Sequence, residues 1–476
     1  MLLKCHGMIA RAFGLALVGG LLSAALSTSA VAKKYTLNEL LELARTQNPG
    51  LRAGDAATHA MQAQVLEAKR NWYPQGDLTS FVAPVPRVEC EGANLTTYPD
   101  QTMREQNCIT TNASPSHGAL QYLTNFAGAY TRTDVKLVQP LWDFGKISAG
   151  VTAAEAGVMV TTGRQAGARA DVELNVRKAY WGLKLARELR SMLEEGEGYL
   201  DSAQKKIEKQ LADGSGNATV SDRLRLRTVR TEIAVRLLEA KRLEEVARSG
   251  LRALLNLDSG GDLDVDDEDF EPLEVPAHPL AYYEEQARSS RPEVRTLDYA
   301  VKAKRALATL EHRKLYPDLV LIGQLSFAYA PTIDSPQNAF ASNPFNGYGG
   351  GVAAALRLPL DFGPKLARGA RTGAEADEVE ARREEALGGV GFEVNKAFLE
   401  LSEAETRLDE VRKGEKAGKA WVAAVTQNFA LGLADSRDFS DALLQSFKMR
   451  TFALQAVYDL NTSTATLSRA TGITVP

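Results

Sequence analysis

The 476-residue chain has few of the side chains that most often build active sites, with only three cysteines and five histidines. No His, Cys and carboxylate residues are spaced as in a metal site, and no pairing of nucleophile and base is recognisable. After residue 32 no apolar run is long enough to form a membrane-spanning helix. These absences argue against an enzyme, a bound cofactor and a helical membrane protein. If the chain crosses a membrane, we expect a closed β-barrel.

The first 32 residues have the pattern of a secretory signal. Lys4 and Arg11 supply the positive region, Phe13–Leu26 the short apolar run, and Ala30–Ala32 the cleavage site. Removal of this segment takes away two basic and no acidic residues, so the formal net charge of −4 becomes about −6. That charge argues against a nucleic acid partner.

Two cysteines remain after the predicted cleavage. Cys90 and Cys108 both lie in Pro84–Gly128, a segment rich in Pro, Asn, Thr and Gly that is typical of a surface loop. In an exported protein such a pair favours a disulfide over a metal or redox site.

The two halves of the chain repeat the same short motifs in the same order. The matched pairs are Asn48–Gly50 with Arg291–Glu293, Tyr73–Pro74 with Tyr316–Pro317, Pro140–Gly145 with Pro359–Gly363, and Gly216–Asp222 with Gly432–Asp438. A repeat of this length is too long for a solenoid unit. The sequence therefore predicts one fold unit duplicated in tandem.

The repeat divides the chain into predicted segments. They are a signal (1–32), a first repeat (33–256), a linker (257–278) and a second repeat (279–471). Within the first repeat we expect strands at about 75–83 and 129–141 and a long helical hairpin at 145–256. Within the second we expect strands at about 317–330 and 347–360 and a hairpin at 363–470.

Helix and strand periodicities both appear, each in its own segment. From Leu387 to Val411 the apolar residues step by three and four, which is a coiled-coil seam. Asp318–Ala330 alternates apolar and polar residues, as expected for a strand with one apolar face. Such strands suit either a transmembrane barrel or a half-buried soluble sheet, and the signal favours the barrel. Four strands are too few to close a barrel, so we expect several chains to share one.

The ordered set of motifs resembles the TolC-like outer membrane efflux family over nearly the whole mature chain. The opening Tyr-Thr-Leu-Asn-Glu-Leu-Leu-Glu-Leu-Ala, the Tyr-Pro before each strand pair, the Asp-Phe-Gly after it and the Gly-x5-Asp turn at each helix tip carry the resemblance. It implies a mainly α protein: a long coiled-coil helical barrel, in which each chain adds four strands to a trimeric 12-stranded transmembrane β-barrel.

The resemblance also implies function and partners. The family forms homotrimeric exit ducts in the outer membrane that extend into the periplasm, for tripartite efflux pumps and type I secretion. Their partners are outer membrane lipid, a periplasmic adaptor (membrane fusion) protein and an inner-membrane transporter of RND, ABC or MFS type. The alternatives are a periplasmic adaptor and a structural coiled-coil envelope protein. Neither accounts well for two hairpins together with two strand pairs.

The resemblance points to the helix-tip turns as the site of the periplasmic aperture. Asp438 and Asp441 match two family aspartates that line the entrance, where a trimer would form two carboxylate rings. The alternative is a purely structural role, in which Asp438 only caps a helix. Some family members carry a basic residue two positions after the glycine of this turn. This chain has Ala434 at that position, and Arg437 is the nearby basic residue that could take its place. The other predicted turn residues are Gly216, Asp222 and Gly432.

Two further motifs have structural interpretations. Asp143 with Gly145, and Asp361 with Gly363, belong to the two Asp-Phe-Gly sequences. The kinase motifs that would accompany a catalytic Asp-Phe-Gly are absent. We expect each aspartate to cap a long helix and each glycine to permit the strand-to-helix turn. The acidic run Asp262–Glu271 lacks the spacing of a calcium loop and is interpreted as a solvated linker.

Overall fold

The computed structural model describes residues 33–90, 108–110, 128–214, 218–257, 263–334 and 343–475. The predicted signal and the turn residue Gly216 lie outside this part of the chain. The first half contains α1 (Leu37–Gln47), α2 (Pro49–Arg70), β2 (Gln75–Val85), β5 (Gly128–Trp142), α3 (Lys146–Asp213) and α4 (Val220–Leu255). The second contains α5 (Leu280–Ser290), α6 (Pro292–Arg313), β7 (Asp318–Tyr329), β8 (Gly347–Arg357), α7 (Phe362–Leu431) and α8 (Ser436–Thr471).

Matching helices in the two halves have nearly the same length. α1 and α5 have 11 residues each, α2 and α6 have 22, and α4 and α8 have 36. The two longest helices, α3 and α7, have 68 and 70. At 1.5 Å per residue they are each about 100 Å long, so the molecule is elongated.

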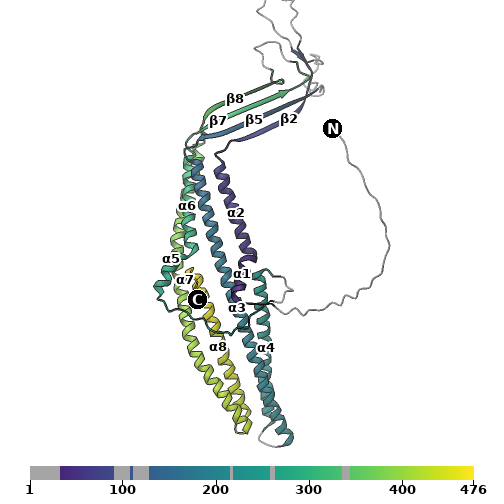
Figure 1. Ribbon diagram of the computed structural model, residues 1–476, viewed down its shortest axis with the longest axis vertical. Helices are drawn as coiled ribbons and strands as arrows, with labels where there is room; N and C mark the ends of the chain where they lie inside the picture. The colour runs from purple at the N-terminus through teal and green to yellow at the C-terminus, as the bar shows by residue number, and fades with distance from the viewer. Residues whose placement is uncertain are drawn as a thin grey trace, which may run out of the picture.

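The elements form three levels that share one lateral order (Figure 1). The four-stranded sheet has the order β2-β5-β7-β8. Next to it, α3 and α6 pack together between α2 and α7, and further from the sheet α3 and α8 pack together between α4 and α7. Because α3 and α7 run through both helical levels, they fix the two levels to each other. The first repeat therefore forms one edge of the molecule and the second repeat the other.

The predicted seam forms the packing surface of α7. Val394, Ala397, Leu401, Ala404 and Leu408 are all buried, and they pack with residues of α5 and α8. Small seam residues let the helix axes approach closely. Gly432, with φ of 77°, ends α7 in the left-handed conformation that glycine adopts without strain.

The two Asp-Phe-Gly sequences differ in what they do. Asp143 accepts hydrogen bonds from the backbone N–H groups of Gly145 (2.9 Å) and Ile147, and Gly145 takes the left-handed conformation with φ of 83°. Asp361 makes no side-chain cap; its carboxylate pairs with Lys365 at 2.8 Å instead. Gly363 lies inside α7 without a positive φ, so the predicted capping and turn roles fail in the second copy.

The antiparallel sheet separates apolar from polar side chains. Leu78, Val135 and Leu325 lie opposite one another on three neighbouring strands. One residue further along, Asp77, Lys136 and Gln324 are in register on the other face. The period of two along each strand produces this separation. None of the described helices is long and apolar enough to cross a membrane.

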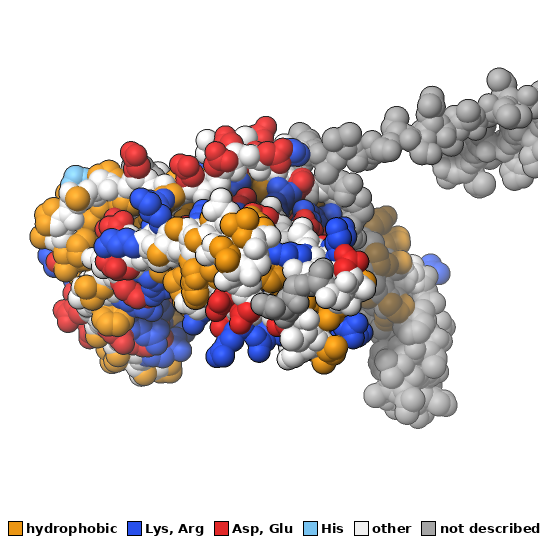
Figure 2. Space-filling model, turned by 90° about the horizontal axis from the view of Figure 1, so that it is seen from below, with side chains coloured by type: hydrophobic (Ala, Val, Ile, Leu, Met, Phe, Trp, Pro, Cys, Tyr) orange, Lys and Arg blue, Asp and Glu red, His pale blue; other side chains and the backbone are white. Residues whose placement is uncertain are grey.

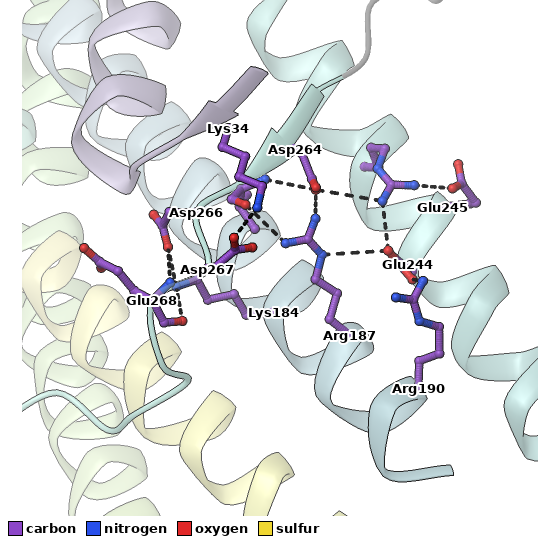
Figure 3. A network of polar contacts seen from close by, with 12 residues as sticks. Lys34, Lys184, Arg187, Arg190, Glu244, Glu245, Asp264, Asp266, Asp267 and Glu268 are labelled. Atoms are coloured by element: carbon purple, nitrogen blue, oxygen red, sulfur yellow. Dashed lines mark hydrogen bonds and ion pairs between the residues drawn. The ribbon is translucent and has the colours of Figure 1, made fainter. Parts of the chain in front are cut away.

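The acidic linker is not simply solvated (Figure 3). Its short strand β6 (Leu263–Val265) pairs in parallel with β1 (Lys33–Tyr35). Asp266 accepts from the buried Lys184 of α3 at 2.6 Å, and Lys34 binds Asp267. Burial opposes ionisation of Asp266, but hydrogen bonds from Lys184 and Tyr180 lower its pKa below the ordinary value. The acids are therefore neutralised by cations of the chain itself, which fastens the linker to α3.

A buried carboxylate holds α3 and α4 together beside this linker. Glu244 is 5% exposed, and its two oxygens lie 2.8 Å from nitrogens of Arg190 and Arg248. A third guanidinium, that of Arg187, lies at 3.8 Å and also pairs with Asp264. Removing this negative charge takes from Arg190 its carboxylate partner at 2.8 Å, while Arg187 keeps Asp264 and Arg248 keeps Glu245.

We expect Glu244→Gln to lower the free energy of unfolding by about 1.5–3 kcal/mol, as when hydrogen bonds between charged groups are lost. The adjacent Glu245 is the matched control, because it is 64% exposed and pairs only with Arg248. Glu245→Gln should cost less than about 1 kcal/mol. Denaturant unfolding followed by helical circular dichroism measures both. Equal midpoints for the two variants would contradict the role given to Glu244.

Candidate functional site

The end of the helices furthest from the sheet is formed by two turns, one in each repeat. The first connects α3 to α4 and the second connects α7 to α8. Thr219 caps α4, and its hydroxyl and backbone N–H are both bonded to Asp222 in a capping box. The sequence motif that ends in Asp222 thus marks a helix start, which fixes the side chain of that aspartate.

Asp222 also joins the two turns. Its carboxylate accepts a hydrogen bond from the hydroxyl of Ser436, the first residue of α8. Burial alone would raise the pKa of Asp222, but the hydrogen bonds from Ser436 and Thr219 outweigh it and lower the pKa. The carboxylate of Asp222 therefore stays ionised to a lower pH than that of an ordinary aspartate.

The second turn is capped by a residue that sequence reasoning missed. Asp435, not Asp438, caps α8: its carboxylate accepts from the backbone N–H groups of Arg437 at 2.9 Å and Asp438 at 2.8 Å. Asp438 and Asp441 lie in the first two turns with exposed side chains. Arg437 is 3.9 Å from Asp441 on the same helix, so within one chain it pairs there. Asp438 is thus left without the capping role.

The helix ends at this turn are held by one basic and two aromatic residues. Lys206 of α3 donates to the carbonyl of Phe429 near the end of α7, and its ammonium lies 4.7 Å from the Phe429 ring centre. A cation is favourable there because the C-terminal end of a helix is negative. Phe429 stacks on Phe439 of α8 with ring centres 5.1 Å apart. These contacts join the end of α7 to α3 on one side and to α8 on the other.

Positive charge at the first tip balances the aspartates of the second. Arg223, Arg225 and Arg227 are exposed in the first turns of α4, and no ion pair involves them within the described residues. The tip as a whole is therefore not simply acidic. Seen from this end, acidic and basic side chains are interspersed with hydrophobic ones (Figure 2). The alternating Arg residues of 223–227 are the sequence signal that could have revealed this.

The opposite end of the molecule carries exposed aromatic side chains in two groups. Where the strands meet the helices these are Trp72, Tyr73, Trp142, Phe144, Tyr316 and Phe362. At the far end of the sheet, on the same face as Leu325, they are Phe327, Tyr329 and Tyr348. Aliphatic residues of the apolar face, such as Leu78, Leu325 and Val352, lie exposed between the groups. Two aromatic bands that flank an apolar band are typical of a sheet at a lipid bilayer.

The two remaining cysteines lie opposite each other. Short strands β3 (Val88–Cys90) and β4 (Cys108–Thr110) pair antiparallel with Cys90 in register with Cys108. Directly opposed residues have Cα atoms about 4.5–5.5 Å apart, which is within the range of a disulfide. The backbone geometry is thus compatible with the predicted bridge, which stays a prediction.

The fold and the sequence both match known proteins. Residues 284–473 match the family model described as outer membrane efflux protein. This match spans most of the second repeat, which is therefore similar to the outer membrane efflux protein family, as the resemblance predicted. No curated protein sequence matches it.

Solved structures share the fold over nearly the whole chain. A structure of CusC has 16% identity and a TM-score of 0.70, and covers 93% of both chains. The CmeC outer membrane channel of Campylobacter jejuni has 15% identity and a TM-score of 0.70, covering 92% of this chain and 85% of its own. VceC of Vibrio cholerae has the same identity and TM-score, covering 92% of this chain and 96% of its own. The likeness shows that the first repeat also shares the fold of these solved structures.

We expect neither Cys90 nor Cys108 to react with a thiol reagent until the protein is reduced. In the chain-entropy model, a bridge closing a loop of this size stabilises the fold by about 3 kcal/mol. Labelling of intact, unreduced protein followed by mass spectrometry measures the free thiols, with reduced protein as the positive control. Two labelled cysteines in the unreduced sample would refute the bridge.

Proposed function

We propose that the chain is a passive exit duct for export across the periplasm and the outer membrane, in a tripartite efflux pump or a type I secretion system. The family match supports an outer membrane efflux channel rather than an enzyme. In this proposal the sheet lies in the outer membrane and the helices extend into the periplasm.

The sheet with its two open edges carries the proposal. Among the strands that the structure describes, β2 and β8 each pair on one side only, while the apolar face with its aromatic bands is suited to lipid. Unpaired backbone groups are very unfavourable in a bilayer, so each edge needs a partner strand. Pairing β2 of one copy with β8 of the next satisfies both edges and closes a ring.

The number of copies follows from barrel size. Two copies would give eight strands, and a barrel of that size is filled by its own side chains. Three copies give twelve strands and leave room for a channel lined by the polar face that carries Asp77, Lys136 and Gln324. The homotrimer implied by the family resemblance is therefore also the smallest ring able to conduct.

The partners proposed for the duct follow from its lack of an energy source. A passive channel needs an inner-membrane transporter, of RND, ABC or MFS type, to drive export, and a periplasmic adaptor to couple the two. The helical tips are the part of the chain furthest from the sheet (Figure 1). We place the entrance there, with Asp438 and Asp441 at the aperture.

We expect the mature protein in detergent to be a homotrimer, because each open sheet edge requires a neighbouring copy. Native mass spectrometry measures the stoichiometry. As a control, the same sample should insert into planar bilayers and form pores. A monomer that still forms pores would rule out the shared barrel.

We expect Asp438→Asn with Asp441→Asn to reduce cation selectivity and block by trivalent cations in planar-bilayer recordings. Rings of carboxylates at a narrow entrance concentrate cations, and an amide does not. Trimer stability should be unchanged, because Asp435 and not Asp438 caps α8. Glu410→Gln, about 30 Å further up α7, is the matched control for loss of a carboxylate. Unaltered selectivity in the double variant would show that these aspartates do not line the aperture.

A further inference from the structure

A hollow of about 240 Å³ lies where α8 ends and α6 begins, close to the C-terminus marked in Figure 1. Gly472, with φ of 72°, ends α8 in the left-handed conformation, and the next two residues, Ile473 and Thr474, line the hollow. The hydroxyl of Ser468 accepts a hydrogen bond from the backbone N–H of Val475 at 3.0 Å, which fixes this last stretch of chain. A face of α3 completes the lining.

The α3 face of the hollow carries a charged residue at every fourth position. Arg169, Glu173 and Arg177 all line the hollow, and their spacing places them on one side of the helix. Much of the remaining lining is apolar and consists of Ala166, Ala170, Leu174, Ala465 and Ile473. The hollow therefore combines charged groups with an apolar wall.

Two of the four ionised side chains in the lining already have partners. Glu173 pairs with Arg45 of α1 at 2.8 Å. The side chain of Arg469 in α8 is 17% exposed and lies 2.6 Å from both Asp171 and Glu293. The charges of Glu173 and Arg469 are therefore compensated within the chain.

The other two ionised side chains, Arg169 and Arg177, have no such partner. Neither makes a hydrogen bond or an ion pair in the part of the chain that the structure describes. Arg177 is partly buried, which lowers its pKa below the ordinary value, and the attraction of Glu173 only partly offsets this. A guanidinium nevertheless stays charged at any ordinary pH. The hollow thus holds positive charge without compensation, which is unfavourable until an anion enters.

We propose that this hollow binds a small organic anion, with a carboxylate or phosphate head group on Arg169 and Arg177 and a short apolar tail against the alanines and Ile473. The planar guanidinium group matches the oxygens of both head groups. The hollow is smaller than the pockets that take drug-sized ligands, so the tail has only a few carbons. Since α3 belongs to the first repeat and α8 to the second, the ligand contacts both repeats within one chain. This site goes beyond the proposed duct and does not depend on how copies assemble.

Butyrate is a suitable probe because it has both parts of the proposed ligand. Isothermal titration calorimetry of the purified mature protein in detergent measures its binding, at an ionic strength held constant with sodium chloride so that screening does not change. We expect saturable binding that is tighter than that of acetate, whose single methyl group buries less apolar surface. Inorganic phosphate is titrated in parallel to separate the two head groups, and saturable binding of either anion at Arg177 supports the site.

Arg177→Gln removes the partly buried cation. We expect the affinity for the anion to fall at least about tenfold, because a hydrogen bond between charged groups is lost. The thermal midpoint without the anion should not fall, because Arg177 has no partner in the described chain to lose. Arg164→Gln is the matched control, since Arg164 is exposed on α3 and lies outside the hollow. It should bind the anion as the wild type does.

Arg169→Gln is a second variant, in case Arg177→Gln does not fold. Arg169 is exposed, so its replacement leaves the packing of α3 intact while it weakens binding. The site is overturned if neither anion binds saturably to the wild type, or if both hollow variants bind as tightly as the wild type. An equal loss of affinity in Arg164→Gln would indicate a general effect of charge and would also overturn it. None of these readouts involves pore formation or stoichiometry, so a failure here leaves the proposed function standing.

Discussion

The unpaired edges of the four-stranded sheet are the constraint on which the rest of the structure depends. Among the described strands, β2 and β8 each pair on one side only, which leaves a row of backbone N–H and C=O groups at each edge of the sheet. Water can satisfy such groups but lipid cannot. In the proposed setting of the outer membrane, each edge of this sheet therefore needs a strand from a neighbouring copy. The lateral order of the helices repeats that of the strands, so the edges of the sheet and of the helical levels belong to the same repeats.

Duplication provides this order, and divergence gives the two repeats different tasks. At Asn48 the first repeat caps α2 with an amide that also donates to the carbonyl of Leu254 at 2.8 Å. The matching position, Arg291, makes no cap and pairs with Glu393 of α7 at 2.7 Å. At the tips, the first repeat presents exposed arginines and the second presents exposed aspartates. A duplicated backbone thus carries an asymmetric charge pattern at its narrow end.

The linker between the repeats ties the two halves together near the middle of the long helix α3. Lys184 of α3 binds Asp266 on one side. On the other side the fully buried Asn461 of α8 accepts from the backbone N–H of Leu273 at 2.8 Å and donates to the carbonyl of Glu271 at 3.0 Å. Since α3 and α8 come from different repeats, the linker acts as a brace across them. Lys184 and Asp266 of this brace are shown in Figure 3.

The sequence alone determined the helices and strands, because the spacing of apolar residues and the placing of turn residues are local properties of the chain. The alternation in Asp318–Ala330 predicted a strand, the steps of three and four from Leu387 to Val411 predicted the buried seam, and the paired motifs predicted the duplication. What each polar residue does was decided only by tertiary structure. Asp435 rather than Asp438 caps α8, Asp361 pairs with Lys365 instead of capping α7, and the acids of 264–267 bind cations from α3 and from Lys34. Such roles depend on which partner lies within about 3 Å in space, a distance that spacing along the chain does not encode.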